Sequence, residues 1–233
     1  MKVDIFSDIR CPFCYVGKKK FEMALEKFSN NKDIEVNWHS FQLDPTLKTQ
    51  PEKDPFEFFS ESKGVSESQA RMMHGHAAAA GKEAGIEFNF DNQIVANSYK
   101  AHLMIQLAKT KGLANEMEEE LFKAQLVNAQ NIDDEATLIE LGKNIGISED
   151  EVKNALTSDE MKHAVSQDEL LARNIGVRAV PFFIFNDKYA VSGAQQPEVF
   201  SEVLQKSWEE FSAGDNGLQI IEGQSCDVNG NCN

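Results

Sequence analysis

Four cysteines form two closely spaced pairs, one near each end of the 233-residue chain. Cys11 and Cys14 belong to the motif Cys-Pro-Phe-Cys, and Cys226 and Cys232 enclose five residues with an Asn-Gly sequence suited to a turn. Each spacing allows the two sulfur atoms of a pair to meet in a disulfide. Alternatively, the four cysteines of two such pairs can together bind a zinc ion as thiolates. The elements that position the cysteines must therefore decide between redox and metal chemistry.

The residues around the first pair favour redox chemistry. Residues 2–7 predict a strand, Pro12 suits the first turn of a helix, and residues 34–43 alternate apolar and polar side chains like a second strand. This β-α-β order predicts a parallel pair joined by a helix. Cys11 then lies at the helix N-terminus, where the helix dipole and free N–H groups stabilise a thiolate. We expect Cys14, one turn further on, to be the more buried thiol and to resolve a mixed disulfide.

A helical block of residues 44–176 interrupts this pattern. Its predicted helix starts are two capping boxes and one further cap: Ser66 with Gln69, Ser148 with Glu151, and Thr157 with Glu160. Strands return at residues 182–185 and 189–191 around a tight turn, and a last helix follows to about residue 211. We expect an α/β fold in which residues 1–43 and 177–211 form one mixed sheet, with a large all-helical insertion. Residues 212–233 predict a loosely ordered acidic tail.

A proline directly precedes the returning strand. Val180 and Pro181 stand just before residues 182–185, where a proline is tolerated and is often cis when the turn is tight. Taken alone, this proline is better explained as an ordinary proline at a strand start.

The Cys-Pro-Phe-Cys motif, the helical block and residues 176–195 (GVRAVPFFIFNDKYAVSGAQ) together resemble the DsbA-like thiol–disulfide oxidoreductases, and most of all their FrnE-type branch. The resemblance spans essentially the whole chain. It implies a thioredoxin-like fold with Cys11 as nucleophile and Cys14 as resolving thiol. It also implies that Val180-Pro181 is a cis-proline loop that offers backbone hydrogen bonds to an extended substrate.

The same resemblance extends the candidate substrate site beyond the cysteines and the cis-proline loop. The further candidates are Pro12 and Phe13 in the motif, and Asn97 and His102 in a stretch similar to one near the family's active site. For His102, a half-buried core histidine is the alternative. The family resemblance implies no bound cofactor and makes glutathione a candidate redox partner.

Two positions depart from the family pattern. Strongly oxidising relatives have a histidine where this chain has Phe13, which stabilises no thiolate, so we expect a weaker oxidant and a better reductant or isomerase. Thioredoxin-like enzymes also carry a buried acid six residues before the nucleophile, and here that residue is Ile5. Asp8 or a water molecule is the candidate to move the proton instead.

The second pair, Cys226 and Cys232, supports two interpretations. The first is an accessory dithiol that exchanges with Cys11 and Cys14. The second is a pair with no role in exchange, either a disulfide that only closes the tail (an inert clip) or two inert thiols. Zinc shared by both pairs would require remote tail thiols to reach the helix start, and His74-x-His76 is a weak metal signal because residues two apart on a helix face different ways. We therefore predict no metal.

Composition limits the partners. The net charge of −15 argues against nucleic acid and anionic lipid as partners. The sequence has neither a secretory signal pattern nor a run of about 18 apolar residues. We expect a cytoplasmic protein that acts on disulfide-containing proteins or low-molecular-weight thiols, without nucleic-acid or membrane partners.

Two other functions compete with this one. A glutathione-dependent enzyme resembling the kappa-class transferases and 2-hydroxychromene-2-carboxylate isomerases would share the inserted architecture, but these usually have serine at the first active-site position and no C-x-x-C. A holdase-like binding protein would bind its clients in an apolar groove. Met72 and Met73 are flexible apolar side chains that are suited to line such a groove. Retention of both Cys11 and Cys14 counts against the glutathione-dependent enzyme, and ordinary core packing explains Met72 and Met73 better than a holdase groove does.

Overall fold

The β-α-β start of the chain forms one side of a mixed sheet, with β2 at the edge. The computed structural model describes residues 1–214, 219–221 and 226–227. The strands are β1 (Lys2–Ser7), β2 (Glu35–Ser40), β3 (Ala179–Val180), β4 (Phe182–Phe185), β5 (Tyr189–Ser192), β6 (Gln219–Ile221) and β7 (Cys226–Asp227). The five-stranded sheet has the order β2-β1-β4-β5-β6. β1 pairs parallel with β2 and antiparallel with β4, so the predicted parallel pair is confirmed.

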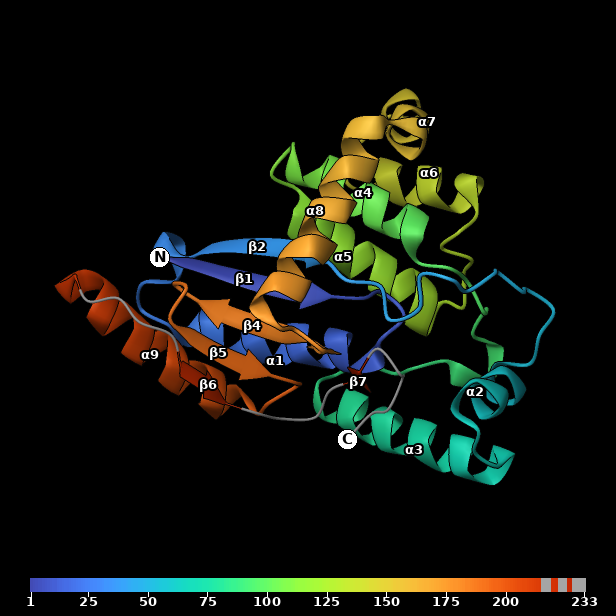
Figure 1. Ribbon diagram of the computed structural model, residues 1–233, viewed down its shortest axis with the longest axis horizontal. Helices are drawn as coiled ribbons and strands as arrows, with labels where there is room; N and C mark the ends of the chain where they lie inside the picture. The colour runs from blue at the N-terminus through green and yellow to red at the C-terminus, as the bar shows by residue number, and fades with distance from the viewer. Residues whose placement is uncertain (215–218, 222–225, 228–233) are drawn as a thin grey trace.

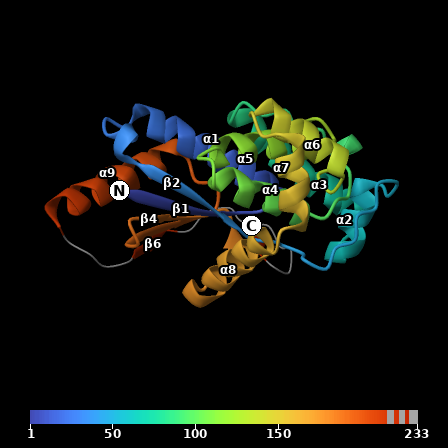
Figure 2. The same cartoon turned by 90° about the horizontal axis from the view of Figure 1, so that it is seen from above.

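Helices cover both faces of the sheet. They are α1 (Pro12–Lys27), α2 (Pro55–Lys63), α3 (Glu67–Glu83), α4 (Tyr99–Lys109), α5 (Ala114–Phe122), α6 (Glu135–Asn144), α7 (Glu149–Thr157), α8 (Asp159–Ile175) and α9 (Pro197–Ala213). Figure 2 shows α1 and α9 on one face of the sheet and α8 on the other. The elements between β2 and β3 are helical, and α4 to α7 form a group beside β2 (Figure 1). No helix in the described part of the chain is long and apolar enough to span a bilayer.

Aromatic side chains fill the space between α1, the sheet and α9. The Phe21 ring centroid lies 5.6 Å from that of Phe183, 6.1 Å from Phe185 and 5.8 Å from Phe200. Each of these residues is at most 1% exposed. Offset and edge-to-face aromatic pairs of this kind add to the stabilisation from burial of apolar area. This packing fixes α1, which carries the first cysteine pair, against the sheet.

Most local start signals of helices are confirmed, and one is wrong. The capping boxes at Ser66 and Ser148 both form. Thr157, however, is the last residue of α7, and its hydroxyl donates back to the carbonyl of Lys153 within that helix. The cap of α8 is instead Ser158, whose side chain accepts from the backbone N–H of Met161.

One predicted strand is shorter in the structure, and two short strands lie in the described parts of the tail. The strand predicted at residues 34–43 ends at Ser40. The backbone N–H of Leu43 donates to the Asp8 carboxylate and not to a backbone carbonyl of a neighbouring strand. Residues 219–221 and 226–227, the parts of the tail beyond residue 214 that the structure describes, form β6 parallel to β5 and β7 antiparallel to β3, and the loose order of the tail stays a prediction. Without β6 and β7, the edges of β5 and β3 would leave backbone N–H and C=O groups unpaired, and the two tail segments pair with these groups.

A histidine bridged by two carboxylates joins the helices to the sheet. His39 on β2 lies 2.7 Å from an Asp168 oxygen on α8 and 3.0 Å from an Asp4 oxygen on β1. The second Asp168 oxygen accepts from the Ser40 backbone and, at 2.6 Å, from Gln106 on α4. Burial would lower the pKa of His39, but the two carboxylates outweigh it and raise the pKa. This network holds α4 and α8 to the same two strands.

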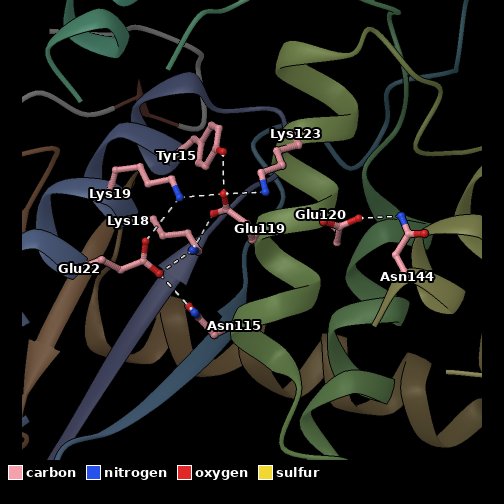
Figure 3. Close-up of polar contacts among 9 residues, drawn as sticks. All are labelled: Tyr15, Lys18, Lys19, Glu22, Asn115, Glu119, Glu120, Lys123 and Asn144. Atoms are coloured by element: carbon pink, nitrogen blue, oxygen red, sulfur yellow. Dashed lines mark hydrogen bonds and ion pairs between the residues drawn. The ribbon is translucent and has the colours of Figure 1, made fainter. Parts of the chain in front are cut away.

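A cluster of charges joins α1 to α5 (Figure 3). Glu119 on α5 lies 2.8 Å from the ammonium of Lys18 and 2.7 Å from that of Lys19, and it accepts from the Tyr15 hydroxyl at 3.0 Å. Lys18 is 1% exposed and also pairs with Glu22 at 2.6 Å. Burial would raise the pKa of Glu119, but Lys18 and Lys19 outweigh burial and lower it to about 2.

Replacing Glu119 should therefore destabilise the protein in a pH-dependent way. Because the pKa of Glu119 falls from about 4.3 in the unfolded chain to about 2, its stabilisation is present above about pH 4.5 and is lost as the pH falls towards 2. We expect Glu119→Gln to lower the free energy of unfolding by about 2 kcal/mol at pH 7 and by much less at pH 2.5. Urea unfolding at both pH values measures this difference.

The matched control is Glu120→Gln on the same helix. Glu120 contacts Asn144 at 2.8 Å, away from the lysines (Figure 3). Its replacement should change stability by no more than about 0.5 kcal/mol at either pH. A Glu119→Gln effect of equal size at pH 7 and pH 2.5 would contradict the ion-pair account.

Candidate active site

Cys11 lies at the N-terminus of α1 and faces the loop before β4. It is the N-cap residue of α1, with Pro12 in the first turn, and its N–H donates to the main-chain oxygen of Asp8 at 2.9 Å. The Cys11 thiol donates to the Val180 carbonyl at 3.7 Å, and the Val180–Pro181 peptide bond is cis. The structure thus brings together Cys11 and the proline loop, which are 169 residues apart.

The two thiols are free and differ in their surroundings rather than in overall exposure. Cys11 and Cys14 are both 1% exposed, so the expectation that Cys14 is the more buried residue is wrong. Burial, followed by the hydrogen bond and charge of Cys11, raises the pKa of the Cys14 thiol well above its usual range. The Ser7 hydroxyl and the Asp8 N–H act in the opposite direction but are outweighed. Cys14 therefore keeps its proton at neutral pH.

Asp8 is a buried acid in the turn that leads to Cys11. Its side chain accepts from the backbone N–H groups of Arg10 at 3.1 Å and Leu43 at 2.8 Å, and lies 3.6 Å from Nε2 of His102. Burial would raise the pKa of Asp8, but His102, Arg10 and the Leu43 N–H outweigh it and lower the pKa. Asp8 is a carboxylate at neutral pH. Ile5, at the position of the family's buried acid, is fully buried and apolar.

His102 and Asn97 lie behind the site rather than at its surface. His102 is completely buried, unlike the half-buried core residue considered as an alternative, and it reaches the site through Asp8. Asn97 donates to the carbonyl of Leu47 at 2.7 Å and accepts from the N–H of Tyr99 at 2.7 Å. Asn97 therefore holds the start of α4 against the loop after β2.

A pocket of about 650 Å³ opens beside Cys11. Cys11, Pro12 and Phe13 line it, whereas Cys14, Val180 and Pro181 do not. Most of the rest of the lining comes from the loop after β2, from α2, α3 and α8, and from residues 90–95. A small ligand could therefore reach Cys11 from a side that the proline loop does not occupy.

Two residues at the site escaped the sequence-based prediction. Arg10 precedes the nucleophile, lines the pocket and lies within the electrostatic influence of Cys11, Asp8 and Asp44. A cation directly before the Cys-x-x-Cys motif was the signal for it. Gly17 on α1 faces Pro181: a Cβ atom there would lie 2.9 Å from Pro181 Cγ and 3.3 Å from Phe183 Cζ. A glycine inside a helix, which lowers helix stability, was its signal.

The second cysteine pair is described only in part. The backbone of Cys226 in β7 pairs with that of Val180, while Cys232 lies outside the described residues. Over residues 1–214, 219–221 and 226–227, no three His, Cys, Asp or Glu side chains are grouped to hold a metal ion.

These features define a thioredoxin-like fold in which a Cys-x-x-Cys motif at a helix start faces a cis-proline loop. Residues 2–205 match the family described as DSBA-like thioredoxin domain, and the chain belongs to this family of thiol–disulfide oxidoreductases. The FrnE-type branch stays a prediction.

Three proteins illustrate the similarity. A probable DsbA oxidoreductase from Streptomyces coelicolor has 30% sequence identity and a TM-score of 0.84, covering 100% of this chain and 98% of its own. The uncharacterized protein YwbO of Bacillus subtilis is 28% identical over 207 residues, 87% of this chain and 94% of YwbO. The cytosolic disulfide reductase DsbM from Pseudomonas aeruginosa shares the fold at 16% identity, with a TM-score of 0.64 and coverage of 90% and 99%.

The unequal surroundings of the two thiols predict unequal alkylation. In the reduced native protein at pH 8, iodoacetamide should modify Cys14 at least about tenfold more slowly than Cys11, because burial holds the pKa of Cys14 high. Mass-spectrometric mapping of timed samples measures both rates. In Cys11→Ser, Cys14 should stay slow, since burial is the largest cause of its raised pKa. Equal rates for the two thiols would contradict this assignment.

The contact between Gly17 and Pro181 predicts a second effect. Gly17→Ala should lower the free energy of unfolding by about 1–3 kcal/mol and slow disulfide exchange, because the added methyl group displaces Pro181 or α1. Gly75→Ala on α3 is the control: no atom lies within 4 Å of its added Cβ, so it should stabilise the helix by up to about 1 kcal/mol. Urea unfolding and exchange rates of both variants test this. A neutral Gly17→Ala would show that the contact relaxes without cost.

Proposed function

We propose that the chain is a dithiol–disulfide oxidoreductase that reduces or isomerises disulfides of proteins and low-molecular-weight compounds. The observation that carries the proposal is the position of the Cys11 thiol. It lies at the N-cap of α1, 3.7 Å from the Val180 carbonyl and next to cis-Pro181. The helix start stabilises a thiolate, and the backbone edge before the proline, which β7 uses in this structure, suits an extended disulfide substrate that takes the place of β7.

The proposed reaction has two exchange steps. The Cys11 thiolate attacks one sulfur of the substrate disulfide, a bond forms between them, and the other substrate sulfur leaves as a thiolate that takes up a proton. Cys14 then attacks the Cys11 sulfur and displaces the second substrate sulfur, and the Cys14 proton goes to this departing thiolate. The substrate gains two electrons and two protons, and the protein is left with a Cys11–Cys14 disulfide.

Several features favour net reduction or isomerisation in the cytoplasm. Phe13 is 6% exposed and carries no group that stabilises the Cys11 thiolate, which disfavours a strong oxidant. Two molecules of a thiol such as glutathione would return the Cys11–Cys14 disulfide to the dithiol and form glutathione disulfide. The similarity to DsbM, a cytosolic disulfide reductase also known in a structure with GSH, supports this thiol and this compartment.

The second pair fits an accessory role in the same reaction. The backbone pairing of Val180 with Cys226 brings the tail to the residue before the cis-proline. In this proposal Cys226 and Cys232 form a dithiol that exchanges with the Cys11–Cys14 disulfide. The inert-clip interpretation predicts instead that their oxidation state is independent of that of the first pair.

The proposal predicts complete dependence on Cys11. Reduction of insulin and refolding of scrambled ribonuclease should vanish in Cys11→Ser, because no other thiol occupies the helix start. Cys14→Ser should accumulate the mixed disulfide between Cys11 and substrate, visible as a covalent adduct by mass spectrometry. Thermal unfolding of both variants checks that they fold.

Two results would contradict the proposed dithiol–disulfide oxidoreductase function. Turnover that survives in Cys11→Ser would exclude the dithiol mechanism. Saturable glutathione binding that persists in Cys14→Ser, without disulfide reduction by the wild type, would favour the glutathione-dependent transferase or isomerase.

A further inference from the structure

The pocket beside Cys11 has the size and walls of a small-molecule site. Its volume of about 650 Å³ lies within the 300–1,000 Å³ typical of ligand pockets. Aromatic rings supply much of its wall: Phe13, Phe41, Phe58, Phe59 and Phe90. A wall of this composition favours a flat apolar group, because aromatic pairs gain energy beyond the burial of area.

His74 on α3 places a hydrogen-bond acceptor in this aromatic wall. Its Nδ1 lies 2.8 Å from the carbonyl oxygen of Ala70, which can only accept, so Nδ1 carries the proton. The rings of Phe56, Phe59 and Phe90 surround His74 at centroid distances of 4.6–5.0 Å. Burial lowers the pKa of His74, which keeps the imidazole neutral at pH 7.

The second ring nitrogen of His74 is therefore open to a ligand. In a neutral imidazole with the proton on Nδ1, Nε2 offers a lone pair. His74 lines the pocket, and no side chain or backbone group of the described residues donates to Nε2. A hydroxyl group on a ring in this pocket can supply the missing donor.

Cations line the pocket of a chain whose net charge is −15. They are Arg10, Lys63 and Arg173, against the acids Asp44 and Glu169. Arg173 forms no ion pair within 4.0 Å with any of the residues that the structure describes, and burial raises the pKa of neighbouring Glu169. A guanidinium group in this setting suits a carboxylate of the ligand.

The route to Cys11 through this pocket does not involve the proline loop. β7 pairs with Ala179 and Val180, which are the backbone groups that an extended polypeptide would use. Neither of these two residues lines the pocket. A small ligand can thus reach Cys11 while β7 stays paired.

We propose that this pocket binds low-molecular-weight disulfides whose thiol-bearing unit carries a hydroxylated aromatic ring and a carboxylate. The ring lies among the phenylalanines, its hydroxyl donates to His74 Nε2, and the carboxylate pairs with Arg173. The inference rests on the proposed function: Cys11 attacks the bound disulfide, the aryl-bearing thiol leaves with a proton, and Cys14 completes the two-electron reduction.

A matched series of small disulfides tests each contact. The probes are the disulfide-linked dimers of N-acetyl-Cys-Tyr, N-acetyl-Cys-Phe, N-acetyl-Cys-Ala and the C-terminal amide of N-acetyl-Cys-Tyr. We expect kcat/KM for the Tyr acid to exceed that for Phe, and that for the amide, by about tenfold each, the factor expected for one hydrogen bond to a charged or polar partner. The Ala compound should be the poorest substrate of the four.

Two variants assign these preferences to residues. His74→Phe should abolish the preference for Tyr over Phe and keep the preference for acid over amide, and Arg173→Gln should do the reverse. The controls are changes at neighbours on the same helices that do not line the pocket, His76→Phe at an exposed residue and Lys162→Gln at a half-buried one, and both should keep both preferences. Thermal unfolding confirms that each variant is folded. Unaltered preferences in His74→Phe and Arg173→Gln would overturn the proposal.

A disulfide without ring or charge separates this proposal from the proposed function. If the wild type reduces bis(2-hydroxyethyl) disulfide but does not distinguish the four dipeptide probes, the pocket assignment fails and the oxidoreductase function stands. If the wild type reduces none of these disulfides, both fail.

Discussion

The buried carboxylate of Asp8 is the interaction on which the geometry of the site depends. It closes the turn from β1 to α1 through the Arg10 N–H and ties this turn to the chain after β2 through the Leu43 N–H. Its contact with His102 adds α4. An unpaired buried carboxylate would cost several kcal/mol, so the three segments are held where they satisfy it. Since the Cys11 N–H bonds to the main chain of Asp8, the nucleophile is held by the same turn.

The chemical difference between the two thiols follows from this turn. Cys11 ends the turn, caps α1 and lines the pocket, whereas Cys14 lies one helical turn further on, near Ser7 and Asp8. The two residues are equally little exposed but differ in position, because Cys11 lines the pocket and Cys14 does not. Close packing of α1 on the cis-proline, which Gly17 permits, keeps the Cys11 sulfur beside the Val180 carbonyl.

Signals contained within a few residues could be predicted, whereas environments made by distant segments could not. The capping boxes at Ser66 and Ser148 and the helix start at Cys11 depend on neighbours three residues away. By contrast, three adjacent acids on α5 look alike in the sequence. Glu118 is buried, which raises its pKa to about 8, Glu119 pairs with lysines of α1, and Glu120 contacts Asn144. Only the packing of α5 against α1 and α6 distinguishes them. For the same reason the aromatic surroundings of His74 and the strands of the tail had no local signal.

Two ways to reach one sulfur atom have different consequences for the choice of substrate. An extended polypeptide that adds to the edge at Val180 competes with β7 for the same backbone groups, so its access depends on the position of the tail. A ligand in the pocket meets Cys11 from the side of α2, α3 and α8 and makes no use of that edge. The helical segment inserted between β2 and β3 supplies most of these walls, since its helices contribute Phe58, Phe59, His74 and Arg173. Selectivity for small disulfides would therefore be a property of the inserted helices, and selectivity for polypeptides a property of the sheet edge and the tail.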